Sequence, residues 1–189
     1  YSGHSYIFKG FYLVQSARNE IHAAAQTWGV APQAIAAALA DEYSTSVNLK
    51  YPFDEGQNLW ASEVLDLSLA QLSYPDMFDR KDPRNKFNPF YPSYQDLGPG
   101  NIKARTALRL FEHYVMNDTG PNPITAYLYR FVSPDAPTEE KWTVFKKEML
   151  LSARGSAWLA GAEMARGRDL LGPFMQGLPP EEQAAILVT

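Results

Sequence analysis

The sequence contains no cysteine, and this absence excludes several kinds of structure and chemistry together. Disulfides, metal sites built from thiolates and a cysteine nucleophile are all ruled out. The three histidines, His4, His22 and His113, lie far apart and lack the spacing of metal ligands or of a Ser-His-Asp triad. The sequence therefore predicts no metal and no other cofactor.

Long apolar runs and a strong excess of basic charge are missing too. No apolar run is long enough to cross a bilayer, so no membrane span is expected. The formal net charge is −4 and the basic residues are scattered, so nucleic acid is not an expected partner. Tyr1 begins the chain without Met or a signal-like segment, so we expect a processed or excised piece of a polypeptide.

The chain has what one helical domain needs. Its 189 residues, 46% of them hydrophobic, predict a single domain over residues 1–189 with a sizeable core. Strand signals are weak, and the short pieces Tyr6–Phe8 and Tyr51–Phe53 leave room for one small β-hairpin. Hydrophobic periodicity predicts a mainly α protein with helices over residues 11–28, 32–44, 59–72, 102–116, 126–131, 138–153, 156–171 and 180–187.

Local signals mark several helix ends. Gly29 is expected to end the first helix, Pro32 to open the second, and Thr138 to cap a later one. Between residues 73 and 100, the prolines at positions 75, 83, 89 and 92 forbid a long helix, and the segment also holds six aromatic residues. A loop of this length is usually functional or irregularly packed, and the sequence leaves open whether it is a lid or a fixed wall.

Glu42 stands out because of the helix face on which it falls. Ile35, Ala38, Leu39 and Glu42 are spaced i, i+3, i+4 and i+7, and the other three are apolar. No basic residue lies within four positions of Glu42. Partial burial without a cation raises the pKa of a carboxyl group, which suits a general acid. The alternative is a Glu at a helix end that simply reaches water.

A second informative stretch is Asp96–Leu108, which holds Gly98-Pro99-Gly100 immediately before a predicted helix. Such a turn exposes backbone, so a flat ligand can approach closely and bond to its amide groups. The alternative is an ordinary tight turn into a helix.

Together the two stretches resemble the lysozyme-like superfamily, in particular lytic transglycosylases and goose-type lysozymes. The turn Gly29–Pro32 leads to Glu42-Tyr43-Ser44, with one residue inserted between the Glu and the Ser of the family pattern. The family's next motif is matched by Gly98, Asn101, Ile102, Thr106 and Ala107. The helix around residues 157–171 resembles a later family helix loosely.

The resemblance covers about a third of the chain and has clear departures. Asn101 stands where the family has Gln, and Pro99-Gly100 replaces Leu-Met. The family's downstream Tyr-Asn-Ala-Gly segment has no counterpart, and the stretch from Glu42 to Gly98 is longer than usual. An insertion is therefore expected between the two motifs.

The resemblance implies a lysozyme-like helical domain that cleaves peptidoglycan between N-acetylmuramic acid and N-acetylglucosamine. Glu42 is then the general acid, and Ser44, Gly98 and Asn101 bind or orient the glycan strand. Tyr94, with Tyr91, is expected either to stack on a sugar ring or to cover a hydrophobic core.

The group that attacks the anomeric carbon is left open. A second carboxylate that positions water would make an inverting hydrolase. Asp54 and Glu55 are the expected catalytic partners in that case, with Glu63 and Asp66 as further candidates. Without a second carboxylate, the 6-hydroxyl of the substrate attacks and leaves an anhydro-sugar, as in lytic transglycosylases. The long insertion makes a second acid feasible, so hydrolysis is slightly favoured.

Two other readings stay open beside the muramidase. One is a non-catalytic carbohydrate- or protein-binding module on the same scaffold, since fold does not guarantee activity. The other is a cell-wall-degrading bacterial toxin domain from a larger secreted protein, held by an inhibitor or immunity protein. A substrate in the cell wall implies a secreted or periplasmic location.

Overall fold

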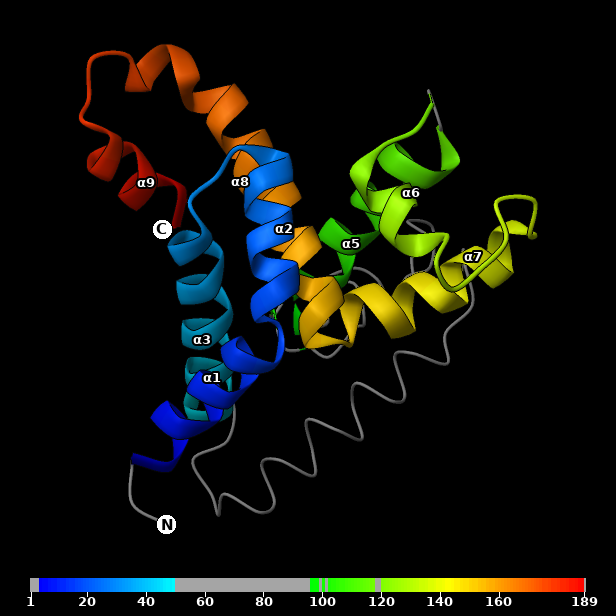
Figure 1. Ribbon diagram of the computed structural model, residues 1–189, viewed down its shortest axis with the longest axis horizontal. Helices are drawn as coiled ribbons and strands as arrows, with labels where there is room; N and C mark the ends of the chain where they lie inside the picture. Colours follow the sequence, from blue (N-terminus) through cyan, green and yellow to red (C-terminus); the bar gives the residue numbers. More distant parts are fainter. Residues whose placement is uncertain (1–3, 50–95, 99, 101, 118–119, 189) are drawn as a thin grey trace, which may run out of the picture.

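The computed structural model of the chain describes residues 4–49, 96–98, 100, 102–117 and 120–188, and it is mainly helical, which confirms the predicted class (Figure 1). The helix expected over residues 59–72 and the strand piece Tyr51–Phe53 lie outside the described residues, as does most of the stretch from 73 to 100.

Three helices form the N-terminal part: α1 (His4–Ser16), α2 (Arg18–Trp28) and α3 (Pro32–Leu49). The prediction of a single helix over residues 11–28 is wrong. The helical segment begins at His4 and is interrupted at Ala17, whose φ and ψ are −101° and 8°. The β-favouring piece Tyr6–Phe8 lies inside α1, so that expectation is also wrong. Gly29 ends α2 as predicted, with a left-handed φ of 63°.

The middle of the chain begins with a two-residue ladder. β1 (Asp96–Leu97) pairs antiparallel with β2 (Ile102–Lys103), so that Asp96 is opposite Lys103 and Leu97 opposite Ile102. The helix predicted over residues 102–116 therefore starts two residues late, as α5 (Ala104–Phe111), and continues as the π-helix η4 (Glu112–Met116). Leu108, Phe111 and Val115, which follow one another at helical spacing, are all buried.

The C-terminal part contains α6 (Pro123–Leu128), α7 (Thr138–Val144), the π-helix η5 (Phe145–Leu150), α8 (Ala153–Met175) and α9 (Pro180–Val188). Thr138 is not the cap of α7: Pro137 takes that position and makes no side-chain bond. Side-chain caps occur instead at Asn122 for α6 and at Ser152 for α8, where each side chain accepts a hydrogen bond from a backbone N–H three residues later.

Helix α8 organises the core, since α2, α3, α6, η5 and α9 all contact it. Leu159, Ala162, Met164 and Ala165 form a buried seam on this helix. One apolar cluster joins α8 to α5, α6, α7 and the π-helices, and the other joins it to α1, α2 and α3. Trp28 packs against both clusters and meets Gly161, where an added Cβ would lie 2.7 Å from Trp28 Cδ1.

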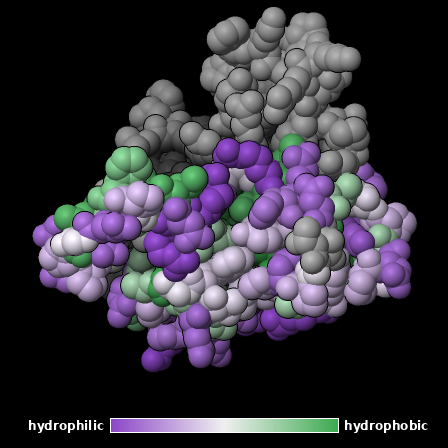
Figure 2. Space-filling view, turned by 90° about the horizontal axis from the view of Figure 1, so that it is seen from above, coloured by the Kyte–Doolittle hydropathy of each residue, from purple (hydrophilic) through white to green (hydrophobic). Residues whose placement is uncertain are grey.

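The surface is mixed, with small hydrophobic patches among hydrophilic residues on the face seen from above (Figure 2). The distal part of α8 exposes Leu170 and Phe174. Helix α1 exposes Phe11, which is 60% accessible, although in the sequence it precedes Val14, Ala17 and Ile21 by steps of three and four that place it on their apolar face. Within the described ranges, none of the helices combines the length and the apolar character that crossing a membrane requires.

Candidate functional site

Helix α3 carries two of the predicted site residues, Glu42 and Ser44. It runs through both positions, so the helix is longer than the predicted 32–44. The apolar face predicted before Glu42 is partly confirmed: Ile35 is fully buried, Leu39 is 1% exposed and Ala38 is half-buried. Position 42 follows Leu39 by three residues and Ile35 by seven, which is the same side of an α-helix. The side chains of Glu42 and Ser44 lie outside the described part of the structure.

Helix α1 approaches α3 closely just before Glu42. Gly10 on α1 is buried, and a Cβ added there would lie 3.3 Å from the carbonyl oxygen of Ala40 and 3.6 Å from its Cβ. A glycine at the crossing lets two backbones approach in this way. The position of α3 around residue 40 therefore depends on the packing of α1.

The turn between β1 and β2 contains Gly98, the third predicted site residue. Its φ is +66°, a left-handed value that glycine adopts without strain. A Cβ at this position would overlap the carbonyl oxygen of Leu150 and lie 3.1 Å from Leu151 Cα. Gly98 thus allows the turn to lie against the end of η5, which is a structural reason for glycine here. Its expected contact with a sugar stays a prediction.

The same turn touches the first residues of α8. A Cβ at Gly100 would lie 3.0 Å from Ser156 Cβ, and Ser156 Oγ donates a hydrogen bond of 3.2 Å to the Leu150 carbonyl oxygen. Ser156 is completely buried. The turn, the end of η5 and the start of α8 therefore form one tightly packed unit.

Helix α8 connects this unit to α3. Ala157, the residue after Ser156, is fully buried in the same apolar cluster as Ile35 and Leu39. Of these two neighbouring residues of α8, Ser156 lies against the Gly98–Gly100 turn and Ala157 belongs to the apolar cluster that contains the buried residues of α3. Thr106 and Ala107, the last matched positions of the second stretch, follow on α5, where Ala107 is buried and Thr106 Oγ1 accepts a hydrogen bond from Arg109.

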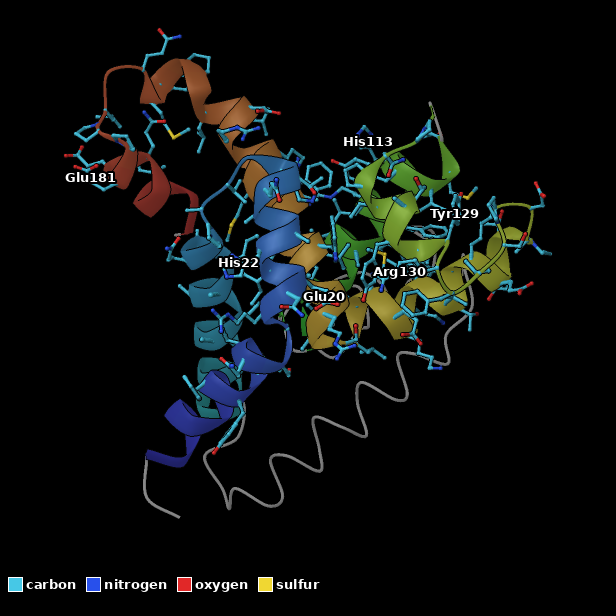
Figure 3. All side chains as sticks on the ribbon, viewed as in Figure 1. Glu20, His22, His113, Tyr129, Arg130 and Glu181 are labelled. Carbon is cyan, nitrogen blue, oxygen red and sulfur yellow. The ribbon has the colours of Figure 1, made fainter. Side chains whose placement is uncertain are left out.

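The remaining predicted site residues, Asp54, Glu55, Tyr94 and Asn101, lie outside the described residues, together with Glu63, Asp66 and Tyr91. Figure 3 shows His22 on α2 and His113 on η4, well apart. In the part of the chain that is described, no group of three or more His, Cys, Asp or Glu side chains could hold a metal ion.

A group of charged residues around Tyr127 was not singled out by the sequence. The ring of Tyr127 is 4% exposed, and burial raises the pKa of its phenol. Glu20 and Glu148 raise this pKa further, whereas Arg130 and Arg154 lower it; the Arg130 guanidinium carbon lies 4.9 Å from the ring centre. In the view of Figure 3, Glu20 on α2 and Arg130 after α6 lie in the same region of the molecule. These residues come from four helices and the turn after α6, so no motif in the sequence could have revealed the group.

No family model, no curated protein and no solved structure matches the chain.

Proposed function

We propose that the protein cleaves the glycan strands of peptidoglycan, with Glu42 as the general acid. The observation that carries the proposal is the packing on α8. Ala157 lies in a cluster with Ile35 and Leu39, one and two turns before Glu42, while Ser156 meets the Gly98–Gly100 turn. The two stretches that resemble the lysozyme-like motifs are far apart in the sequence, yet both pack with the first turns of α8, one in the cluster of Ala157 and the other against Ser156.

The buried face of α3 supports a carboxyl that keeps its proton near neutral pH. Ile35 and Leu39, seven and three positions before Glu42, are buried on this side of the helix, and desolvation disfavours an ionised carboxylate. In the proposed reaction the Glu42 carboxyl gives its proton to the glycosidic oxygen as the bond from that oxygen to the anomeric carbon breaks. The leaving sugar departs with a hydroxyl group, and Glu42 becomes a carboxylate.

The attacking group distinguishes two forms of the proposal. With Asp54 or Glu55 as base, water adds to the anomeric carbon and its proton passes to that carboxylate, which gives a reducing end. With no second carboxylate, the 6-hydroxyl of the muramic acid attacks and its proton passes to Glu42, which gives an anhydro end. We favour hydrolysis. A substrate in the cell wall places the activity in a secreted or periplasmic setting, where an inhibitor protein is a reasonable partner.

Digestion of purified peptidoglycan tests the proposal. The native protein, Glu42→Gln and the neighbouring Asp41→Asn are compared, and the ends of the released muropeptides are identified by mass. We expect Glu42→Gln to lose roughly 10²–10⁴-fold in rate, as for removal of a general acid, and Asp41→Asn to stay near the native rate. Asp41 is the matched control because it lies about 100° round the helix from Glu42.

Two outcomes would contradict parts of the proposal. Undiminished cleavage by Glu42→Gln would reject Glu42 as the acid. No cleavage by the native protein would reject the enzyme and favour the carbohydrate-binding module. Circular dichroism of each variant separates loss of chemistry from loss of fold.

A further inference from the structure

A pocket of about 230 Å³ opens between α1 and α2 on one side and the first turns of α3 on the other. Its apolar lining includes Val14, Ile21 and Ala36, one from each of the three helices. An apolar cavity of about 150 Å³ is large enough to hold benzene. The pocket therefore has room for one large apolar side chain.

An arginine, Arg18, lines the pocket together with His22, and no acidic residue of the described chain does. Arg18 is exposed, and its side chain makes no hydrogen bond or ion pair with the rest of the described chain. Figure 3 shows His22 between α2 and α3. Glu20 is two positions from each of them along the sequence, so it lies on another side of α2. There it raises the pKa of Tyr127.

Two exposed aromatic residues extend the pocket along α1. Phe11 is 60% exposed and Tyr12 is 68% exposed, and their ring centres lie 5.9 Å apart in an edge-to-face arrangement. Phe11 precedes the pocket residues Val14 and Gln15 by three and four positions, which places it on the same side of the helix. Aromatic residues and arginine are both enriched at the centres of protein–protein interfaces.

We propose that this surface, made of Phe11, Tyr12, the pocket, Arg18 and His22, binds an acidic segment of a protein partner. The partner inserts one large apolar side chain into the pocket and sets its carboxylates against Arg18 and His22. Opposite charge selects this partner, since Arg18 is the one charged side chain among the described residues that line the pocket, although the chain as a whole carries a net charge of −4. The proposal is independent of the cleavage reaction.

Two synthetic helical peptides test the proposal. Both carry the same leucine and phenylalanine positions on one face; one has glutamates beside them, and the other has lysines at the same places. Binding to the native protein is followed by fluorescence anisotropy at low salt. We expect the glutamate peptide to bind at least about tenfold more tightly than the lysine peptide, which corresponds to one favourable charge contact.

Three variants assign the binding to this surface. Arg18→Glu should reverse the preference between the two peptides, and the fold should tolerate the change because Arg18 is exposed. Ala36→Trp should fill the pocket and weaken both peptides. Phe174→Ser, which removes an 80% exposed ring from the distal part of α8, is the control and should change neither. Equal binding of the two peptides, no binding of either, or an unchanged preference in Arg18→Glu would overturn the proposal.

Discussion

Arg168 on α8 holds the C-terminal end of α2 through Trp28. Its Nη1 donates one hydrogen bond of 2.9 Å to the carbonyl oxygen of Trp28 and another of 2.9 Å to that of Gly29. These carbonyls belong to the end of a helix, where no intrahelical donor is left and where a cation is favoured. The turn that leads into α3 is thereby anchored to the central helix.

Replacement of Arg168 by methionine should destabilise the fold. Met retains part of the apolar stem and removes both donors, and a hydrogen bond to a charged group contributes about 1.5–3 kcal/mol. Since the Arg168 side chain is 38% exposed, we expect a loss of about 1–2 kcal/mol, measured by urea unfolding. Asp169→Asn is the control. It removes only the ion pair with Arg168 and should cost less than about 0.5 kcal/mol; an equal loss in both variants would assign the effect to that ion pair.

Gly98→Ala should be more costly than an ordinary loop substitution. The left-handed backbone costs an alanine about 1–2 kcal/mol, and the overlap with the Leu150 carbonyl adds about 1–3 kcal/mol. Gly177→Ala separates the two contributions, because Gly177 also has a positive φ, 88°, but a Cβ there meets nothing within 4 Å. Urea unfolding should give the larger loss for Gly98→Ala. Equal losses would mean that the turn moves freely away from η5.

Helix ends were predictable where a single residue determines them. Gly29 ends α2 because its left-handed conformation is intrinsic to glycine, and Pro32 opens α3 because its φ is fixed in advance. The buried residues of α5 were predictable because apolar residues that recur every 3.6 positions show which side of a helix faces the core.

The break at Ala17 was not predictable, because alanine is the best helix former and nothing local interrupts the pattern. Ala17 is fully buried, so tertiary packing decides the change of direction there. The break at Ala17 also explains why Phe11 is exposed, although the helical spacing of the apolar residues placed it on the buried side. For the candidate site, the sequence picked out Gly98 as a glycine that a turn requires, but the close contact with Leu150 depends on a residue far along the chain.

Gly10→Leu should separate α1 from α3. The position is buried against Ala40, whose carbonyl oxygen lies 3.3 Å from where a Cβ would be, so a larger side chain must push the helices apart. Overpacking of this kind costs about 1–3 kcal/mol. If Glu42 is the general acid, cleavage should also fall, because residue 40 moves with it. Ala37→Leu, at an exposed position of α3, is the control and should stay within about 0.5 kcal/mol of the native protein. A fully native stability for Gly10→Leu would contradict the close helix crossing.

Lys146 should make stability depend on pH in the alkaline range. The residue is 3% exposed, and burial lowers the pKa of its amine from the usual 10.5, with Glu139 acting in the opposite direction. Between the lowered pKa of the folded state and 10.5, the unfolded chain binds more proton than the folded chain at this group. The free energy of unfolding therefore gains a positive slope with pH in that interval, of at most about 1.4 kcal/mol per pH unit for one proton. Below that pH interval the Lys146 amine is protonated in both states, so the full cost of burying its charge reduces the free energy of unfolding.

Lys146→Met should remove this contribution while it keeps an unbranched side chain against Trp142, whose ring centre lies 5.8 Å from the Lys146 amine. Urea unfolding from pH 7 to pH 10.5 measures the difference between the native protein and the variant. We expect the native protein to gain stability relative to Lys146→Met as the pH rises. Lys147→Met is the matched control, because its side chain is 80% exposed and Lys146 stays in place, so the slope of the native protein should persist. A difference between the native protein and Lys146→Met that does not change with pH would show that the Lys146 amine binds its proton equally well in the folded and unfolded chain.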